Sequence, residues 1–292
     1  MRFTLRQLEV FLAVARFESV SRAADELGMS QSAASGSLGD LERQFDIQLF
    51  DRVGKRLVLS ELGRSLRPNA EALQEHAREL EIRLANRNEV GRLRVGATLS
   101  IGNYLTAPLI ARYLELHPTA RVTLDIANTA QIARKIQNFE LDVGLIEGEI
   151  EHPDLEMTRF REDELRVFCA PGHPFAKHRA LRDRHLLSAD WIVREPGSGT
   201  RQAFEHSMHG ILPELRIAFE LQHTEAIKSA VKAGLGVGCV SRIALEDEFR
   251  AGTLVPCRVP ERDFRRYFYL VLRRDKYQSA AVREWLALTR TA

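Results

Sequence analysis

Cysteine is scarce in this chain: only Cys169, Cys239 and Cys257 occur among its 292 residues. They lie far apart, form no C-x-x-C pair and are odd in number, which argues against a disulfide framework and against a zinc site. No apolar run approaches the roughly 20 residues that a membrane-spanning helix needs. The first residues, "MRFTLRQLEVFLAVARFESVS", are charged and periodic and lack the apolar block of a signal peptide. We therefore expect a cytoplasmic protein with no membrane partner.

Motifs for catalysis or cofactor binding are also missing. The chain has no P-loop, G-x-S-x-G or H-E-x-x-H motif, and its nine histidines are scattered without partners at metal-ligand spacing. The stretch "GLGVGC" (234–239) resembles a dinucleotide loop, but it follows a helical pattern and precedes a strand pattern, which is the wrong order. We expect no enzyme activity, no catalytic residue, no cofactor and no metal.

Neither sign of charge is in large excess. The net charge is +2, and residues 1–60 contain eight cationic and eight acidic residues. A nucleic-acid partner is therefore neither favoured nor excluded by the sum of charges, and the case for one depends on where the charges lie.

The first sixty residues contain a pattern typical of a helix-turn-helix. After a first apolar-periodic segment, Ser21 is expected to cap a short second helix, which Gly28 ends. A third helix follows, with Gln31, Ser32 and Ser35 on its polar face, where short hydrogen-bonding side chains can reach base edges. A small helical bundle without DNA function is the alternative at this point.

A basic hairpin is expected next, in "IQLFDRVGKRLVLSELG". Two short β-prone runs flank a Val-Gly turn, and Arg52, Lys55 and Arg56 cluster there. Such a wing would lie along the phosphate backbone, where cations position the reading helix without reading sequence.

These segments together resemble the winged helix-turn-helix of LysR-type transcriptional regulators. The family features S-x-x-x-A-A-x-x-L, S-Q-x-A-x-S and L-E-x-x-x-x-x-x-L-F-x-R are matched by residues 19–27, 30–35 and 41–52. The resemblance implies that residues 1–60 bind double-stranded promoter DNA. One departure is the run Gly36, Ser37, Gly39 and Asp40, where many members carry a basic or bulky residue. Specificity is therefore expected to depend on Gln31, Ser32 and Ser35.

Residues 61–89 are expected to form a dimerising linker helix. Leu66, Ala70, Leu73, Ala77, Leu80 and Leu84 recur at spacings of four and three, which is a heptad seam. The alternative is a helix that packs only on its own domain. Two-fold symmetry of a dimer predicts a DNA site with dyad symmetry.

Residues 90–292 alternate between strand and helix patterns, which predicts an α/β domain with a largely parallel sheet. The order resembles the two-lobed, periplasmic-binding-protein-like effector domain of LysR-type regulators. On that resemblance, lobe I comprises about 90–161 and 267–292, and lobe II about 162–266. A solute-binding protein without DNA function is the alternative reading of this half.

Hydroxyl residues mark four helix starts in this half, each after an apolar run. They are Thr98, Ser100, Thr129, Ser198, Thr200 and Thr224. Free backbone N–H groups at helix starts favour anions, and open α/β sheets bind ligands at this edge. The glycines of "EPGSGTRQAF" are expected to let a ligand approach the backbone. Any one of these residues is also an ordinary helix cap.

The pattern resembles the branch of the family that senses small anions of sulfur assimilation and carbon fixation. This implies an effector such as sulfite, sulfate or a small carboxylate, although Glu147 would repel a dianion if it faced the cleft. By the same resemblance we expect a homodimer or homotetramer that acts on RNA polymerase through effector-dependent DNA bending.

Overall fold

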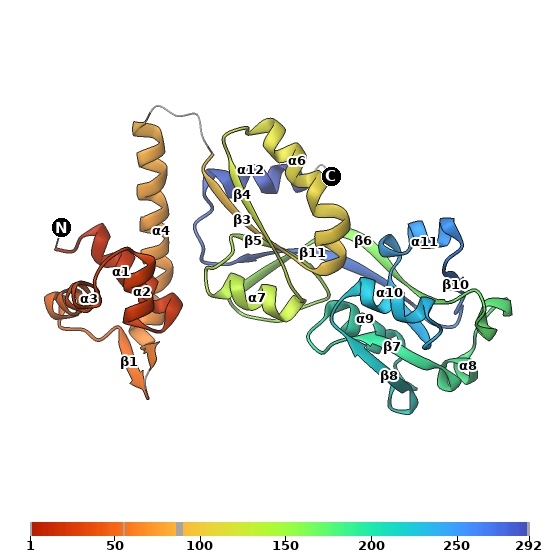
Figure 1. Cartoon of the computed structure of the whole chain (residues 1–292). Helices are drawn as coiled ribbons and strands as arrows, with labels where there is room; N and C mark the ends of the chain where they lie inside the picture. Colours follow the sequence, from red (N-terminus) through yellow and green to blue (C-terminus); the bar gives the residue numbers. More distant parts are fainter. Residues whose placement is uncertain (1, 55, 86–89, 291–292) are drawn as a thin grey trace.

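The computed structural model describes residues 2–54, 56–85 and 90–290, and it begins with three short helices (Figure 1). These are α1 (Leu5–Phe17), α2 (Val20–Glu26) and α3 (Gln31–Phe45). The expected cap of the second helix was wrong by two residues. Ser19 is the N-cap, and its hydroxyl accepts a hydrogen bond from the Arg22 N–H at 3.4 Å. Ser21 instead lies exposed within the first turn of α2.

A two-stranded wing follows the third helix. Strands β1 (Phe50–Val53) and β2 (Arg56–Leu59) pair in antiparallel register, with Val53 opposite Arg56. Gly54 has a φ of +62° at the tip, a conformation that glycine adopts without strain. Lys55 lies outside the described residues.

The long helix α4 (Glu61–Leu84) continues directly from the wing. The Ser60 hydroxyl accepts a hydrogen bond from the Gly63 N–H at 3.0 Å, as an N-terminal cap does. Ala70 is buried in the core of the three N-terminal helices. Leu66, Leu73, Leu80 and Leu84 are exposed. The expected seam therefore divides: Ala70 packs within the chain, and the leucines of the seam face outward.

The rest of the chain forms one nine-stranded sheet with helices on its faces. Its order is β4-β3-β5-β11-β6-β9-β7-β8, with β10 paired to β6. The strands are β3 (Arg92–Ala97), β4 (Arg121–Ile126), β5 (Val143–Glu147), β6 (Leu155–Cys169), β7 (Asp190–Arg194), β8 (Arg216–Leu221), β9 (Val237–Ser241), β10 (Val255–Cys257) and β11 (Arg265–Arg273).

This sheet has two halves joined by two shared strands. The parallel group β3, β4 and β5 belongs to lobe I, and the parallel group β7, β8 and β9 belongs to lobe II. The long strands β6 and β11 run antiparallel to each other from one half to the other. Figure 1 shows the two lobes side by side, connected by these strands.

Helices cover both halves of the sheet. Lobe I carries α5 (Leu99–Ile101), the π-helix η1 (Gly102–Thr106), α6 (Ala107–Leu116), α7 (Thr129–Gln137) and α12 (Ala280–Thr289). Lobe II carries η2 (Pro174–Lys177), α8 (Asp183–Ser188), α9 (Gly199–Ser207), η3 (Leu212–Glu214), α10 (Thr224–Lys232), η4 (Arg242–Ala244) and α11 (Glu246–Ala251). Among the described helices, none is both long and apolar enough to cross a membrane.

Candidate functional site

The hydroxyl-bearing helix starts converge where the two lobes meet. Thr98 precedes α5, Thr129 begins α7, and Ser198 is the N-cap of α9, where its hydroxyl accepts a hydrogen bond from the Arg201 N–H at 3.4 Å. Together with Ser100 and Thr200, these residues are at most 5% exposed. The structure therefore places five of the six sequence-selected residues in one buried region.

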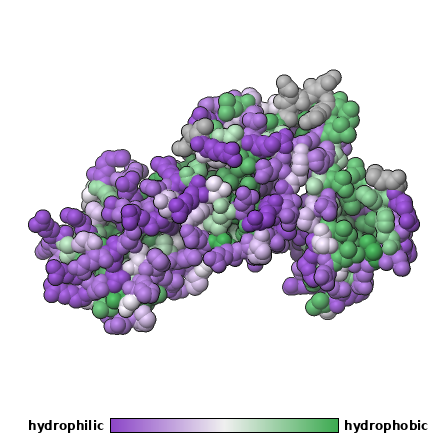
Figure 2. Space-filling view, turned by 180° about the vertical axis from the view of Figure 1, so that it is seen from behind, coloured by the Kyte–Doolittle hydropathy of each residue, from purple (hydrophilic) through white to green (hydrophobic). Residues whose placement is uncertain are grey.

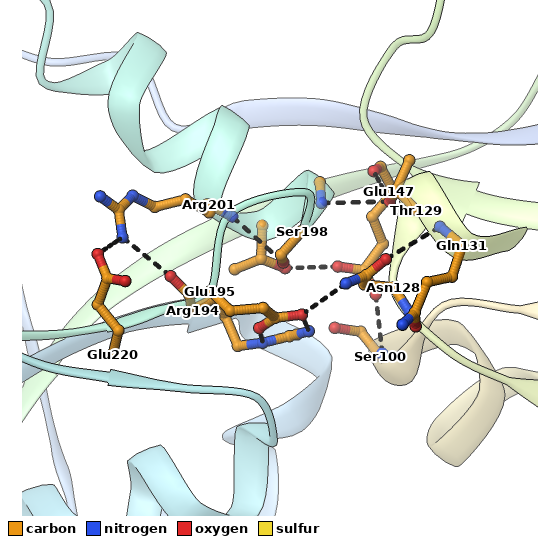
Figure 3. Close-up of polar contacts among 12 residues, drawn as sticks. Ser100, Asn128, Thr129, Gln131, Glu147, Arg194, Glu195, Ser198, Arg201 and Glu220 are labelled. Carbon is orange, nitrogen blue, oxygen red and sulfur yellow. Dashed lines mark hydrogen bonds and ion pairs between the residues drawn. The ribbon is translucent and has the colours of Figure 1, made fainter. Parts of the chain in front are cut away.

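The carboxylate of Glu147 lies at the centre of this region (Figure 3). Glu147 ends β5 and is 1% exposed. One oxygen accepts hydrogen bonds from the Thr98 hydroxyl at 3.1 Å and from the Ser100 N–H at 2.8 Å. The other accepts from the Thr200 hydroxyl of lobe II. The Glu147 carboxylate thus occupies the anion position that the helix starts of both lobes create, and we call this arrangement the cradle.

Arg266 supplies the positive charge of the cradle. Its Nη2 lies 3.2 Å from a Glu147 carboxylate oxygen, and its Nη1 donates to the Thr200 hydroxyl at 3.1 Å. Its Nε donates to Asp163 at 2.7 Å, and the Ser241 hydroxyl donates to the same carboxylate at 2.7 Å. Because Asp163 is on β6 and Arg266 on β11, the cation of the cradle is held by the two strands that join the lobes.

The charge of Glu147 is stabilised despite its burial. Burial alone raises the pKa of a carboxyl group, but here the Arg266 charge and the donated hydrogen bonds outweigh burial and hold the pKa of Glu147 below its usual range. Glu147 is therefore ionised at neutral pH.

A close backbone contact joins the lobes beside the carboxylate. The Thr129 hydroxyl donates to the Glu147 carbonyl oxygen at 2.7 Å and accepts from the Gly199 N–H at 3.2 Å. A Cβ on Gly199 would lie 1.3 Å from that carbonyl oxygen, so only glycine fits there. We expected this glycine to admit a ligand to the backbone; in the structure, the chain's own strand β5 makes that approach.

Charged side chains around the cradle are paired with one another. Arg194 binds both carboxylate oxygens of Glu195, and Asn128 of lobe I donates to Glu195 at 3.2 Å. Arg201 binds Glu205 and Glu220, so it does not face Glu147 (Figure 3). A groove of about 570 Å³ opens next to the cradle, between the starts of α7 and α9.

Thr224 stands apart from the cradle. It is 2% exposed at the start of α10, and within the described chain no hydrogen bond links it to Glu147. The neighbouring residues of α10 instead contact lobe I at a second point, where the Tyr104 hydroxyl donates to Glu225 and the Lys228 ammonium lies 3.4 Å from the Tyr104 oxygen.

The residues selected for DNA binding lie on the three-helix unit and its wing. Gln31, Ser32 and Ser35 are exposed on α3, and Ser30 caps this helix by accepting from the Ala33 N–H at 3.2 Å. Asp40, further along, is paired with Arg43, which offsets its charge. Arg52 and Arg56 are exposed on the wing strands.

Two residues of the cradle were missed by the sequence reasoning. Arg266 and Asp163 sit in strand segments that otherwise read as ordinary apolar-polar alternation. The one available signal was the pair of arginines directly before the apolar run in "RRYFYLVLRR", since a cation that is buried with such a strand is costly unless it is paired. The distant partner could not be identified from spacing.

A helix-turn-helix followed by a two-lobed domain with a polar cleft defines a DNA-binding regulator with a ligand-binding domain. The comparisons agree. Residues 5–64 match the bacterial regulatory helix-turn-helix protein model of the lysR family, and residues 86–292 match the LysR substrate binding domain. The chain belongs to the LysR family of transcriptional regulators, and it is accordingly a regulator rather than an enzyme. Its helix-turn-helix excludes the alternative of a solute-binding protein without DNA function.

Relatives match nearly the whole chain. It is 42% identical over 98% of its length to the HTH-type transcriptional regulator YeiE of Escherichia coli strain K12, covering 97% of that protein. It is 36% identical over 96% of its length to the RuBisCO operon transcriptional regulator of Allochromatium vinosum, covering 93% of it. The regulatory domain of CcmR from Synechocystis PCC6803, in complex with 2-PG, matches 69% of this chain and 97% of its own, with 28% identity and a TM-score of 0.64.

Proposed function

We propose that this regulator binds a promoter dyad as a homo-oligomer and responds to a small anion that enters the cradle. Residues 1–60 bind DNA through Ser21, Gln31, Ser32, Ser35, Arg52, Lys55 and Arg56, residues 61–89 dimerise, and residues 90–292 bind the effector. Lobe I comprises about 90–161 and 267–292, and lobe II about 162–266. The protein acts in the cytoplasm on RNA polymerase.

The outer face of α4 supports dimerisation. Leu66, Leu73 and Leu80 are between 37% and 56% exposed and recur every seven residues. Figure 2 shows hydrophobic side chains gathered on the right of that view, on the side of the molecule that contains the N-terminal helices and α4. Such a strip of leucines on a helix is covered in a coiled coil with a second copy. The two wings are then held at a fixed distance for a DNA site with dyad symmetry.

A second pair of surfaces supports a tetramer. The sheet ends in β4 at one edge and β8 at the other. Both edges expose large apolar side chains: Leu124 and Ile126 on β4, and Phe219 on β8. When two effector domains pair antiparallel, β4 of each copy lies against β8 of the other. The same contact then forms twice, in a closed two-fold arrangement. Because this surface is separate from α4, the two contacts together give a homotetramer.

The single observation that carries the effector proposal is the occupied cradle. Two helix starts, three hydroxyl or N–H donors and one guanidinium surround the Glu147 carboxylate. The Ser100 hydroxyl is 0% exposed and has no hydrogen-bond partner among the described residues. A small oxyanion such as sulfite, sulfate or a short carboxylate matches these donors once it displaces Glu147. Thr129 and Ser198 line the groove through which it enters. Thr224, at the start of α10, is the sixth proposed effector contact.

Effector binding acts on the promoter through the lobes. An anion that binds better with Glu147 displaced shifts the balance between two lobe arrangements by its difference in affinity for them. In a tetramer that shift changes the angle between the two wing pairs and hence DNA bending.

Thermal unfolding against a panel of anions tests this function. We expect one of sulfite, sulfate, thiosulfate, phosphate or small carboxylates to raise the midpoint, by about 2.7 kcal/mol of added stability at a hundred times its dissociation constant. Thr200→Val should abolish the rise, whereas Thr119→Val, at an exposed threonine, should keep it. If no anion raises the unfolding midpoint, or if an anion raises it equally in both variants, the cradle is not the effector site.

A further inference from the structure

Helix α7 connects the cradle to the DNA-binding half of the molecule. At its start, Thr129 bonds both Glu147 and Gly199. At its end, Asn138 accepts a hydrogen bond from Arg67 of α4. The nine-residue helix is about 13 Å long. Figure 1 shows α7 lying between lobe II and α4. A movement at one end of such a short, rigid helix therefore displaces its other end.

The contact at the end of α7 is built around Phe139. This residue has a φ of +59°, which is uncommon for any residue other than glycine and costs free energy. Its buried ring is covered by two guanidinium groups, with the Arg67 carbon 5.0 Å and the Arg273 carbon 4.5 Å from the ring centre. Arg67 itself is 8% exposed. We call Arg67, Phe139 and Arg273 the joint.

Strand β11 makes a second connection between cradle and joint. It carries Arg266, which binds Glu147, near one end and Arg273 at the other. Arg273 Nη1 also donates to the carbonyl oxygen of Gln137, the last residue of α7, at 2.9 Å. Helix α7 and strand β11 therefore both end at Phe139, the side chain that Arg67 contacts.

Some buried donors of the joint lack the hydrogen bonds that a permanent contact would provide. The Nε atoms of Arg67 and Arg273 are buried and have no hydrogen-bond partner among the described residues, although Arg67 Nε lies 3.8 Å from a Glu71 carboxylate oxygen and Arg273 Nη1 lies 3.2 Å from Asp154. Three like charges, those of Arg67, Arg273 and Lys276, also lie around the one Phe139 ring. A buried donor without a hydrogen bond costs free energy, and this cost is removed when the joint opens and water binds the donor. Such a contact is suited to two arrangements, docked and released.

We propose that Arg67 is the residue through which the cradle controls the position of the DNA-binding domain. With Glu147 in the cradle, α7 and β11 present Asn138 and Phe139 to Arg67, and α4 is docked on lobe I. When the cradle contacts change, both elements shift and Arg67 is released. This goes beyond the proposed function, since it concerns the route of the signal and not the effector.

A double-mutant cycle tests the proposal in the full-length protein without ligand or DNA. Glu147→Gln perturbs the cradle, and Arg67→Met removes the joint. Amide hydrogen exchange of the α4 segment around residue 67 reports docking. We expect Glu147→Gln to speed that exchange roughly two- to thirtyfold, the range of typical coupling energies. In the Arg67→Met background, Glu147→Gln should add nothing.

Matched variants keep the test sharp. Arg64, one turn earlier on α4, bonds the Leu59 carbonyl oxygen and not lobe I, so Arg64→Met should preserve the full response. Arg67→Lys serves if Arg67→Met unfolds, and Thr200→Val serves as a second perturbation of the cradle. The proposal is overturned if α4 exchange ignores the cradle variants, or if it responds to them equally without Arg67.

Discussion

Replacing Glu147 by glutamine should destabilise the effector domain strongly, because it removes one of the two buried carboxylates, those of Glu147 and Asp163, that pair with the Arg266 cation. The Glu147 and Arg266 side chains are nearly inaccessible to water, at 1% and 6% exposed. Removing one partner of such a pair costs about 3–5 kcal/mol. Since each kcal/mol lowers the midpoint of a unit of this size by about 2–4 °C, the unfolding temperature should fall by roughly 6–20 °C.

Differential scanning calorimetry measures this directly, with Glu151→Gln as the control. Glu151 is exposed and carries the same charge only a few residues away, so its replacement should shift the midpoint by no more than about 0.5 kcal/mol. In Glu147→Gln, the cradle no longer contains the Glu147 carboxylate, which is its anion in the wild-type protein. A fitting oxyanion at a hundred times its dissociation constant should therefore restore about 2.7 kcal/mol.

The pH dependence checks the sign of the effect. The pKa of Glu147 is lower in the folded state than in the unfolded chain. Its stabilisation is therefore complete above the unfolded pKa of about 4.3 and lost as pH falls through the folded pKa. The difference between wild type and Glu147→Gln should be constant from pH 8 to about 5 and shrink below that. A midpoint change of under about 2 °C, or a difference that persists unchanged in strong acid, refutes the reasoning.

Three further outcomes are expected. Burial would raise the pKa of Asp142, but Lys276 and Arg94 outweigh burial and lower the pKa to about 2. Asp142→Asn should therefore lower the free energy of unfolding by about 2 kcal/mol in denaturant at pH 7, and this loss should fade between about pH 4 and 2. A loss that persists at pH 2 would contradict the prediction. Arg52→Ala should reduce the slope of log affinity against log salt by about 1 in anisotropy titrations with any duplex, and an unchanged slope would mean that no phosphate contact was lost. Leu73→Glu should weaken self-association at least about tenfold in sedimentation experiments, and intact dimers would show that α4 is not the interface.

Local signals in the sequence predicted the elements well and their partners poorly. Ser198 was recognised as a helix start because a capping hydroxyl and its N–H lie three residues apart in the chain. The same reasoning misplaced the cap of α2, since "SVS" offers two serines and only the backbone decides between them. The exposed leucines of α4 followed from the heptad, but the burial of Ala70 depended on a neighbouring helix that spacing does not show.

The cradle shows where sequence reasoning stops. Its hydroxyls could be selected because strand ends and helix starts alternate in the chain. Glu147 was noticed only as a possible repulsion, because its compensating cation, Arg266, lies in the strand that returns from lobe II. A buried charge is intelligible only with its partner, and this partner is set by topology and not by spacing.

The occupied cradle also sets the concentration at which an effector can act. Free anions compete with a carboxylate that is tethered to the site, so the apparent affinity is the intrinsic affinity multiplied by the fraction of molecules with Glu147 displaced. A preference of about 3 kcal/mol for the occupied state weakens the apparent affinity roughly 150-fold. Glu147→Gln should therefore bind the effector anion more tightly than wild type in calorimetric titrations, by a factor that matches the stability that the variant loses. Equal affinities would mean that the anion binds beside Glu147 and does not replace it.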